Sequence, residues 1–292
     1  MRKLGSPAPV DEHTTFAIGS CSRAFTATAL AILVDEGKLG WDDRVGDRLP
    51  GFRMYDAFTS QQMTVKDLLT HRSGLGLGEG DLMFWPASDF TRAEVVDRLK
   101  YLKPATSFRS AYAYDNVLYI AAGELVGAVS GQSWEDFVQA RILTPLGMTD
   151  SAPGFSRLKG SNRAWGHGRI DGPIRGTGHM QALGEASVTD LVNPAGGICA
   201  STRDMARWLS AQLAMGKLAD GSRIWSEAQA KTMWRPVTLI GASALPQTNP
   251  GNTHFTMYAL GWGLRDVHGV PVLGHSGGLQ GAVCRLAVIP EK

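Results

Sequence analysis

The sequence predicts an α+β fold, in which an antiparallel sheet is flanked by helices and joined to a mostly helical lobe. Apolar and amphipathic runs with helix-capping residues fill most of the chain up to about residue 234. Only from about residue 255 do short β-branched and aromatic runs alternate with glycine turns, which is typical of antiparallel strands. We therefore expect one domain over residues 1–292, with the helical lobe at about 40–190 and the strands at about 255–290.

The first predicted helix is apolar on every side. It is expected at about 20–36, because the apolar run from Ala24 to Val34 is followed by Gly37, and glycine commonly ends helices. The run is too short to cross a bilayer, so it predicts a buried core helix and no membrane span.

Further helices are predicted from capping residues. A serine or threonine followed three residues later by aspartate or glutamate satisfies the free N–H groups at a helix start. Such pairs begin at Thr64, Thr91, Ser133 and Ser201, and another short helix is expected at 226–234. The apolar run 117–129 is also predicted to be helical, and its Gly123 and Gly127 are spaced for close packing against a neighbour.

The strands are predicted near the end of the chain. They are expected at 255–267, 270–273 and 282–289, joined by short polar or glycine turns. Residues of about 151–195 are rich in glycine and lack a clear period, so we expect hairpins and loops that cover a site and set its selectivity.

Composition and charge exclude several kinds of partner. The formal net charge is only +2 and the 29 basic residues form no run, so neither nucleic acid nor an anionic membrane is expected. Cys21, Cys199 and Cys284 match no zinc spacing and are expected to be free, buried thiols. The seven histidines show no metal pattern. We therefore expect neither a metal nor a cofactor.

Three short motifs carry the chemistry. They are Ser20-Cys21-Ser22-Arg23, Tyr114-Asp115-Asn116 and His275-Ser276-Gly277-Gly278. Taken singly, the first serine would be a helix cap, the tyrosine a core aromatic and the histidine a satisfied sheet residue. Taken in this order, they resemble the Ser-x-x-Lys, Tyr-x-Asn and Lys-Thr-Gly or His-x-Gly motifs of class C β-lactamases and family VIII carboxylesterases, which are similar to penicillin-binding proteins.

The resemblance covers nearly the whole chain, because residues 69–75, 194–197 and 261–263 also resemble this family. It implies a β-lactamase/transpeptidase-like fold and a serine hydrolase that acts through an acyl-enzyme. It also implies a role for each matching residue. Ser20 would be the nucleophile, Tyr114 a proton shuttle, Asn116, His275, Ser276 and Gly277 substrate-binding residues, and the N–H groups of Ser20 and Gly278 the oxyanion hole. His71 would be structural.

Arg23 departs from the family pattern, which places lysine there. A lysine can lose its proton when desolvated, whereas an arginine in a protein does not. Arg23 would still act in catalysis, since its fixed charge would favour a tyrosinate at Tyr114 that accepts the proton of Ser20. The larger guanidinium is also expected to displace Ser20, and about 1 Å of displacement can cost on the order of a hundredfold in rate. We therefore expect slow or absent turnover.

The ends of the chain also depart from the pattern. Family members carry strands before the Ser-x-x-Lys helix and more strands and a helix after the Lys-Thr-Gly strand, whereas Ser20 comes almost at once here. The sheet is therefore expected to be incomplete, with an uncovered edge through which an oligomer could form. No secretory signal is visible, and because the N-terminus resembles a truncated one, the compartment is left open.

The leading functional prediction is a carboxylesterase that acts on short-chain esters, with activity impaired by Arg23 and with weak β-lactamase activity in addition. His275 in place of lysine favours ester substrates, because lysine would bind a substrate carboxylate more strongly. Three alternatives are a non-catalytic relative that binds an acyl or cell-wall peptide ligand, an amidase like D-aminopeptidases or DD-peptidases, and an incomplete fragment without function. For the hydrolases, the expected partner is a small-molecule ester or amide.

Overall fold

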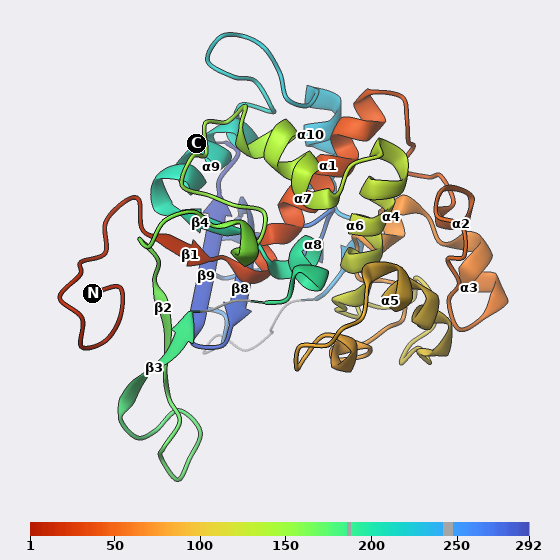
Figure 1. The fold of residues 1–292 in the computed structure, drawn as a ribbon. Helices are drawn as coiled ribbons and strands as arrows, with labels where there is room; N and C mark the ends of the chain where they lie inside the picture. The colour runs from red at the N-terminus through yellow and green to blue at the C-terminus, as the bar shows by residue number, and fades with distance from the viewer. Residues whose placement is uncertain (186–187, 242–247, 292) are drawn as a thin grey trace.

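Helix α1 (Arg23–Asp35) is the element around which other helices pack. Its residues from Arg23 to Leu33 are all buried, as a helix that is apolar on every face requires. The computed structural model describes residues 1–185, 188–241 and 248–291. Within these residues α1 contacts α6 (Val117–Ser130), α7 (Trp134–Val138), α8 (Asn193–Gly196) and α10 (Glu227–Trp234), and it runs through the middle of the molecule (Figure 1).

Apart from α9 (Thr202–Leu213), the other helices of the described residues are short. They are α2 (Val45–Arg48), α3 (Ala57–Gln62), α4 (Val65–Leu68) and α5 (Arg92–Arg98), with the 3-10 turns η1 (Gly19–Ser22), η2 (Asp81–Met83), η3 (Leu99–Tyr101), η5 (Phe155–Arg157) and η6 (Asp190–Val192) and the π turn η4 (Gln139–Leu143). The predicted caps are confirmed. The side chains of Thr91, Ser133, Ser201 and Ser226 each accept the N–H three residues further on, and the Asp67 carboxylate accepts the N–H of Thr64.

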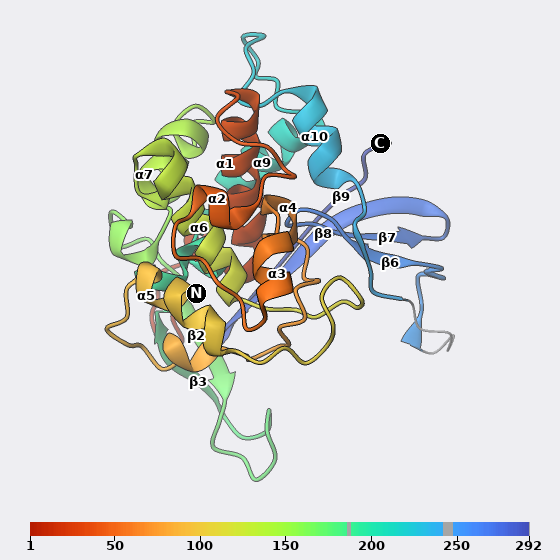
Figure 2. The same ribbon diagram turned by 90° about the vertical axis from the view of Figure 1, so that its right-hand side faces the viewer.

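In the described part of the chain, five antiparallel strands form the main sheet. In spatial order they are β5 (Thr238–Leu239), β6 (Thr256–Tyr258), β7 (Gly263–Val267), β8 (Val270–Leu279) and β9 (Ala282–Val288). Strand β7 pairs with residues 270–274 of β8, and β9 pairs with residues 273–279. Within the described residues, the second half of β8 therefore has β9 on one side and no strand on its other edge, where η1 contacts it. Figure 2 shows the sheet beside the helices.

Two small antiparallel pairs are the other strands that the structure describes. One joins β1 (Thr15–Ala17) to β4 (Cys199–Ser201), and the other is the hairpin of β2 (Trp165–Arg169) and β3 (Met180–Glu185). This hairpin extends away from the body of the molecule in both ribbon views. It confirms the hairpin predicted in the glycine-rich segment 151–195, of which residues 186 and 187 lie outside the described part of the chain.

The predicted α+β class is confirmed, but two predicted strand boundaries are wrong. The predicted strand 255–267 is interrupted between β6 and β7, because Gly261 turns the chain with φ of 76°. A Cβ at Gly261 would lie 2.8 Å from the carbonyl oxygen of Arg23, so this turn packs directly on the start of α1. The predicted strand 270–273 extends to Leu279.

The start of the first helix also differs from the prediction. Ser20 lies in the 3-10 turn η1, and α-helical geometry begins only at Arg23. The predicted end is confirmed, since α1 stops at Asp35 and Gly37 follows with φ of 68°. The nucleophile candidate therefore precedes the helix rather than belonging to its first α-helical turn.

The buried apolar side chains of the helices and of one sheet face form a continuous cluster. The ring of Phe25 on α1 stacks on that of Trp208 on α9, with ring centroids 3.8 Å apart. Leu273, Leu286 and Val288 contribute from the sheet. Within the described residues, none of the helices combines the length and the apolar character that crossing a bilayer requires.

Helix α6 approaches α8 closely at Gly123. A Cβ at Gly123 would lie 2.2 Å from Cγ of Pro194, whereas a Cβ at Gly127 would meet nothing closer than the carbonyl oxygen of Gln132 at 3.5 Å. The predicted close packing is therefore confirmed at Gly123 and is absent at Gly127.

We expect Gly123→Ala to lower the free energy of unfolding by about 1–3 kcal/mol, because the added methyl overlaps a rigid proline ring. Gly127→Ala is the matched control and should leave this free energy unchanged or raise it by up to about 1 kcal/mol, because alanine is the better helix former. Urea unfolding of the two variants measures the difference. Equal stability of the two would contradict the prediction.

Candidate active site

Two hydroxyl groups that are 94 residues apart in the sequence form a hydrogen bond beside β8. The Oη of Tyr114 donates to the Oγ of Ser20 at 2.8 Å. Ser20 lies in η1, and Tyr114 lies shortly before α6. Each hydroxyl can donate and accept, so a proton can pass between them. This contact is formed although arginine, and not lysine, occupies position 23.

Turn η1 lies directly on β8 because glycines leave no side chains between them. A Cβ at Gly19, which has φ of 54°, would lie 2.9 Å from the nitrogen of Gly278. A Cβ at Gly277 would lie 1.9 Å from the carbonyl oxygen of Ile18 and 3.0 Å from the nitrogen of Ser20. The position of Ser20 is thus fixed by contact between two backbones.

The two residues predicted to form the oxyanion hole lie on these facing segments. The pair Leu279–Ala282 closes the β8–β9 turn, so Gly278 belongs to the next pair, which exchanges no backbone hydrogen bonds. Its N–H therefore points away from β9, toward the edge that η1 contacts. The N–H of Ser20 donates to no acceptor within the described residues.

Arg23 is fully buried, and its guanidinium contacts no carboxylate directly within the described residues. Its Nη2 donates to Oδ1 of Asn116 at 2.5 Å, and its Nη1 donates to the carbonyl oxygen of Asp115 at 3.3 Å. The same Nη1 lies 3.1 Å from Nε2 of His71. Its Nε has no hydrogen-bond partner in the part of the chain that the structure describes. The buried cation is therefore held by neutral groups.

Two aromatic faces complete the surroundings of Arg23. The guanidinium carbon lies 4.3 Å from the ring centroid of Tyr114 and 4.5 Å from that of Tyr119, which are cation–π distances. The tyrosine whose hydroxyl contacts Ser20 thus lies beside a fixed positive charge.

Asn116 links Arg23 to a carboxylate. Its Nδ2 donates to both carboxylate oxygens of Asp81, at 3.1 and 3.0 Å. Burial raises the pKa of Asp81, although the hydrogen bond from Asn116 opposes this. The amide of Asn116 is engaged on both sides by protein groups, so its predicted contact with substrate would compete with them.

His71 and Asp115 are buried beside Arg23. Nδ1 of His71 accepts the N–H of Asp115 at 3.2 Å. Burial raises the pKa of Asp115 to about 7, whereas burial and then the charge of Arg23 lower the pKa of His71 well below its usual value. The sequence suggested only a structural role for His71, but its contact with Arg23 makes it part of the site.

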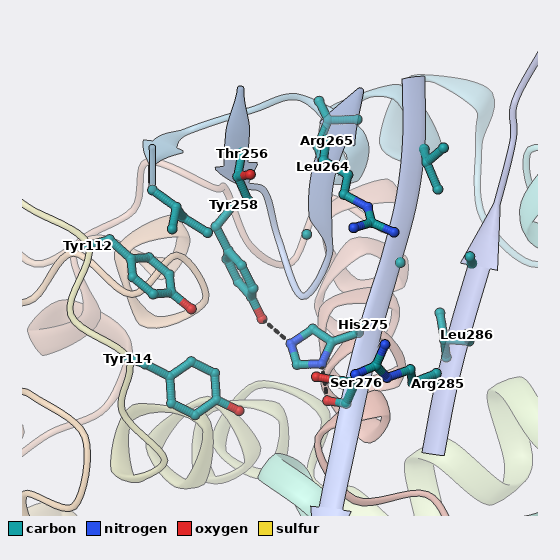
Figure 3. Close-up of a pocket in the computed structure, with 15 residues that line it drawn as sticks. Tyr112, Tyr114, Thr256, Tyr258, Leu264, Arg265, His275, Ser276, Arg285 and Leu286 are labelled. Carbon is teal, nitrogen blue, oxygen red and sulfur yellow. Dashed lines mark hydrogen bonds between the residues drawn. The ribbon is translucent and has the colours of Figure 1, made fainter. Parts of the chain in front are cut away.

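His275 is neutral in this site. Its Nδ1 faces the carbonyl oxygen of Ser276 at 2.7 Å and must donate to it, so its Nε2 accepts the hydroxyl of Tyr258 at 2.8 Å (Figure 3). Burial and then the charge of Arg23 lower the pKa of His275 to about 3. His275 therefore supplies no positive charge for a substrate carboxylate.

A cavity of about 550 Å³ opens beside Tyr114, His275 and Ser276. Gly263, Gly274 and Ala287 are register partners across β7, β8 and β9, and their small side chains leave room over the sheet. Figure 3 shows Tyr112, Tyr114 and Tyr258 on one side of the cavity and Arg265 and Arg285 on the other.

Arg265 and Arg285 give the cavity a positive wall. No aspartate or glutamate lines it, and neither arginine forms an ion pair with a described residue. Together with Tyr112 and Tyr258, these arginines line the cavity and were not predicted from the sequence. Within the same described residues, no group of three histidine, cysteine or carboxylate side chains gathers to hold a metal ion.

Comparison with known proteins gives the family of this fold. A family model described as Beta-lactamase matches residues 1–292. Penicillin-binding protein 4 of Amycolatopsis lactamdurans is 30% identical over 298 residues, which cover 98% of this chain and 72% of that protein. The predicted β-lactamase/transpeptidase-like fold is thereby confirmed.

Two solved structures are similar over nearly the whole chain. The octameric penicillin-binding protein homologue from Pyrococcus abyssi has a TM-score of 0.77 at 25% identity, over 100% of this chain. The D-amino acid amidase from Ochrobactrum anthropi SV3, complexed with D-phenylalanine, has a TM-score of 0.72 at 25% identity, over 94% of this chain and 73% of the amidase. The chain spans 63% of the Pyrococcus protein, which is less than two thirds of its length.

We expect the free energy of unfolding of the natural chain to fall as the pH rises from about 4 to about 7. The free energy of unfolding of Asp115→Asn should not show this fall. Burial raises the folded-state pKa of Asp115 to about 7, above the unfolded value of about 3.9. The folded state therefore binds the proton more tightly, and this stabilisation is lost as the pH rises through the folded pKa, by on the order of a few kcal/mol.

Asparagine is the matched replacement, because it keeps an oxygen that can accept the N–H of Leu118 as Asp115 does at 3.1 Å. Urea unfolding at several pH values between 4 and 8 measures the difference between the two proteins. A difference that does not change with pH would contradict the prediction.

Proposed function

The chain belongs to the β-lactamase family, and we propose that it is a serine hydrolase that forms an acyl-enzyme on Ser20. The observation that carries the proposal is the 2.8 Å hydrogen bond from Tyr114 to Ser20, beside the buried charge of Arg23. The leading substrate class is a short-chain ester.

In the proposed acylation, Oγ of Ser20 attacks the ester carbonyl, and the carbonyl oxygen becomes an oxyanion that the N–H groups of Ser20 and Gly278 stabilise. For this step Tyr114 first releases its own phenolic proton to solvent; the phenolate then takes the proton of Ser20, and the neighbouring charge of Arg23 stabilises the phenolate. Collapse of the intermediate breaks the ester C–O bond, and Tyr114 returns the proton to the leaving alkoxide. Water then attacks the acyl-enzyme by the same route and releases the acid.

Arg23 makes this chemistry slow and favours esters. Arginine does not deprotonate, so Tyr114 is the titratable group that exchanges a proton directly with Ser20. An alkoxide leaves with less help from an acid than an amine does, so a single proton relay is better suited to esters than to amides. The neutral His275 likewise suits an uncharged substrate.

Incubation with p-nitrophenyl butyrate should place an acyl group on Ser20, and Ser20→Ala should abolish the adduct. Tyr114→Phe should slow acylation by about 10²- to 10⁴-fold, because it removes the proton acceptor. Arg23→Lys should acylate faster than the natural chain, because lysine can exchange a proton. Intact mass, peptide mapping and the p-nitrophenolate burst measure these effects.

Thermal unfolding of each variant controls for loss of the fold. An adduct on a residue other than Ser20 would contradict the proposed nucleophile. Absence of an adduct on both the natural chain and a folded Arg23→Lys would contradict the enzyme proposal and favour the non-catalytic alternative, a pocket that binds an acyl or cell-wall peptide ligand.

A second candidate function is hydrolysis of a peptide or β-lactam that carries a free carboxylate. Among the described residues, Arg265 and Arg285 have no ion-pair partner and no carboxylate lines the cavity, so the two arginines would attract such a group. The same positive charges repel substrates with a free amino group. They therefore favour a DD-peptidase-like substrate, which ends in a carboxylate, over a D-aminopeptidase-like substrate, which begins with an amine. The similarity to penicillin-binding proteins and to a D-amino acid amidase supports an amide substrate of this kind.

If this second function holds, a peptide ending in D-alanyl-D-alanine should be cleaved with a kcat/KM about 10- to 100-fold higher than the same peptide with an amidated C-terminus. The double change Arg265→Gln and Arg285→Gln should remove this preference. Arg203→Gln, on the exposed face of α9 outside the cavity, is the matched control. Equal cleavage of the two peptides by the natural chain would exclude this candidate.

A further inference from the structure

We propose that Cys21 and Cys284 are a redox modification site, at which a peroxide closes a disulfide behind Ser20 and slows acylation. This inference goes beyond the hydrolase function, and only its effect on acylation rests on that function. The two thiols are 263 positions apart in the sequence and lie on η1 and β9, two elements that contact each other.

The fold places both thiols on the same side of β8. Cys21 directly follows Ser20 in η1, and its buried Sγ donates to the carbonyl oxygen of His275 at 3.3 Å. Cys284 on β9 is the register partner of Gly277 on β8. Because Gly277 has no side chain and lies against the nitrogen of Ser20, nothing on β8 separates the thiol of Cys284 from η1.

The two thiols interact with each other. A hydrogen bond between their side chains raises the pKa of Cys21, to which burial adds, and lowers the pKa of Cys284. Cys21 has a single proton, so this proton turns from the carbonyl of His275 to Cys284 when Cys284 ionises. Cys284 is thus the more acidic thiol of the pair, and because it is only half-buried it is the thiol that a small oxidant reaches first.

The oxidation balances with hydrogen peroxide as the oxidant. The thiolate of Cys284 attacks one peroxide oxygen, the O–O bond breaks, and the leaving hydroxide takes up a proton to become water, which leaves a sulfenic acid on Cys284. The sulfur of Cys21 then attacks this sulfenic sulfur. An S–S bond forms, the S–O bond breaks, and the proton of Cys21 leaves with the hydroxyl as a second water. A dithiol such as dithiothreitol reverses the change.

The disulfide would act on the residue next to it. It replaces the hydrogen bond from Cys21 to His275 by a covalent bond between η1 and β9. The turn that carries Ser20 is then held by a different strand, and the 2.8 Å contact with Tyr114 must adjust. Because about 1 Å of misplacement can cost on the order of a hundredfold in rate, we expect acylation to fall at least about tenfold in the oxidised protein.

Cys199 supplies a matched control within the same chain. It is buried like Cys21, and burial raises its pKa to about 12. Its Sγ donates to the carbonyl oxygen of Gly197 at 3.6 Å, and neither of the other two thiols contributes to its pKa. It should therefore resist oxidation under conditions that close the pair.

The experiment treats the full chain with hydrogen peroxide and digests it without reduction, after alkylation of the remaining thiols. We expect a linked peptide containing Cys21 and Cys284 that is lighter by two hydrogen atoms than its two parts, with Cys199 alkylated. Cys284→Ser should give no linked peptide, whereas Cys199→Ser should behave like the natural chain. Dithiothreitol should restore both free thiols and the acylation rate with p-nitrophenyl butyrate.

Separate sulfinic acids on the two cysteines, a link that includes Cys199, or a link between two chains would overturn the proposed site. A linked pair with an unchanged acylation rate would overturn the proposed effect on Ser20. The reduced protein reports on the hydrolase function separately: if it forms no acyl adduct, that function fails, and the peptide map still decides whether the thiol pair exists.

Discussion

The site depends on one physical constraint, which is the burial of a guanidinium that has no carboxylate in contact with it. Burying an unpaired charge is costly, and the surroundings of Arg23 offset that cost with an amide oxygen, a backbone carbonyl and two aromatic faces. Within the described residues, the nearby carboxylates do not pair with the guanidinium directly. Asp81 is reached through Asn116, and Asp115 lies beside the cation with its pKa raised by burial to about 7. The charge of Arg23 is therefore only partly neutralised, and Tyr114 lies closest to it among the groups that contact Ser20.

This cluster also has more hydrogen-bond donors than acceptors. Nδ1 of His71 faces the N–H of Asp115, and its Nε2 faces an N–H group of Arg23. A neutral imidazole carries one N–H of its own and accepts through only one nitrogen, so one of these two contacts is not a hydrogen bond. With Nε of Arg23 unpartnered as well, the larger side chain at position 23 fits with two unsatisfied interactions.

The sequence predicted the motif residues and most helices, but not the whole site. Capping pairs such as Thr91 with Glu94 act over three residues and can be recognised from local chemistry, which is why they were predicted. Tyr258 and Arg285 enter the site through the pairing of β6 to β9, and no local signal distinguishes them from other strand residues. The break in the predicted strand 255–267 was also missed, because it depends on the contact of Gly261 with the start of α1.

The backbone contact between η1 and β8 fixes the position of Ser20. The same contact makes that position sensitive to a change in the neighbouring strands. Side chains usually separate the backbones of two packed elements. When one element shifts, side chains of the other can change rotamer, so that its backbone need not move. Here Gly19 and Gly277 have no side chains to separate the two elements, so the backbone that carries Ser20 rests on the backbone of β8. Any change in the position of β8 or β9 is then transmitted to Ser20 directly. The proposed disulfide at Cys21, one residue from Ser20, would therefore shift the η1 backbone where no side chain can compensate for the movement.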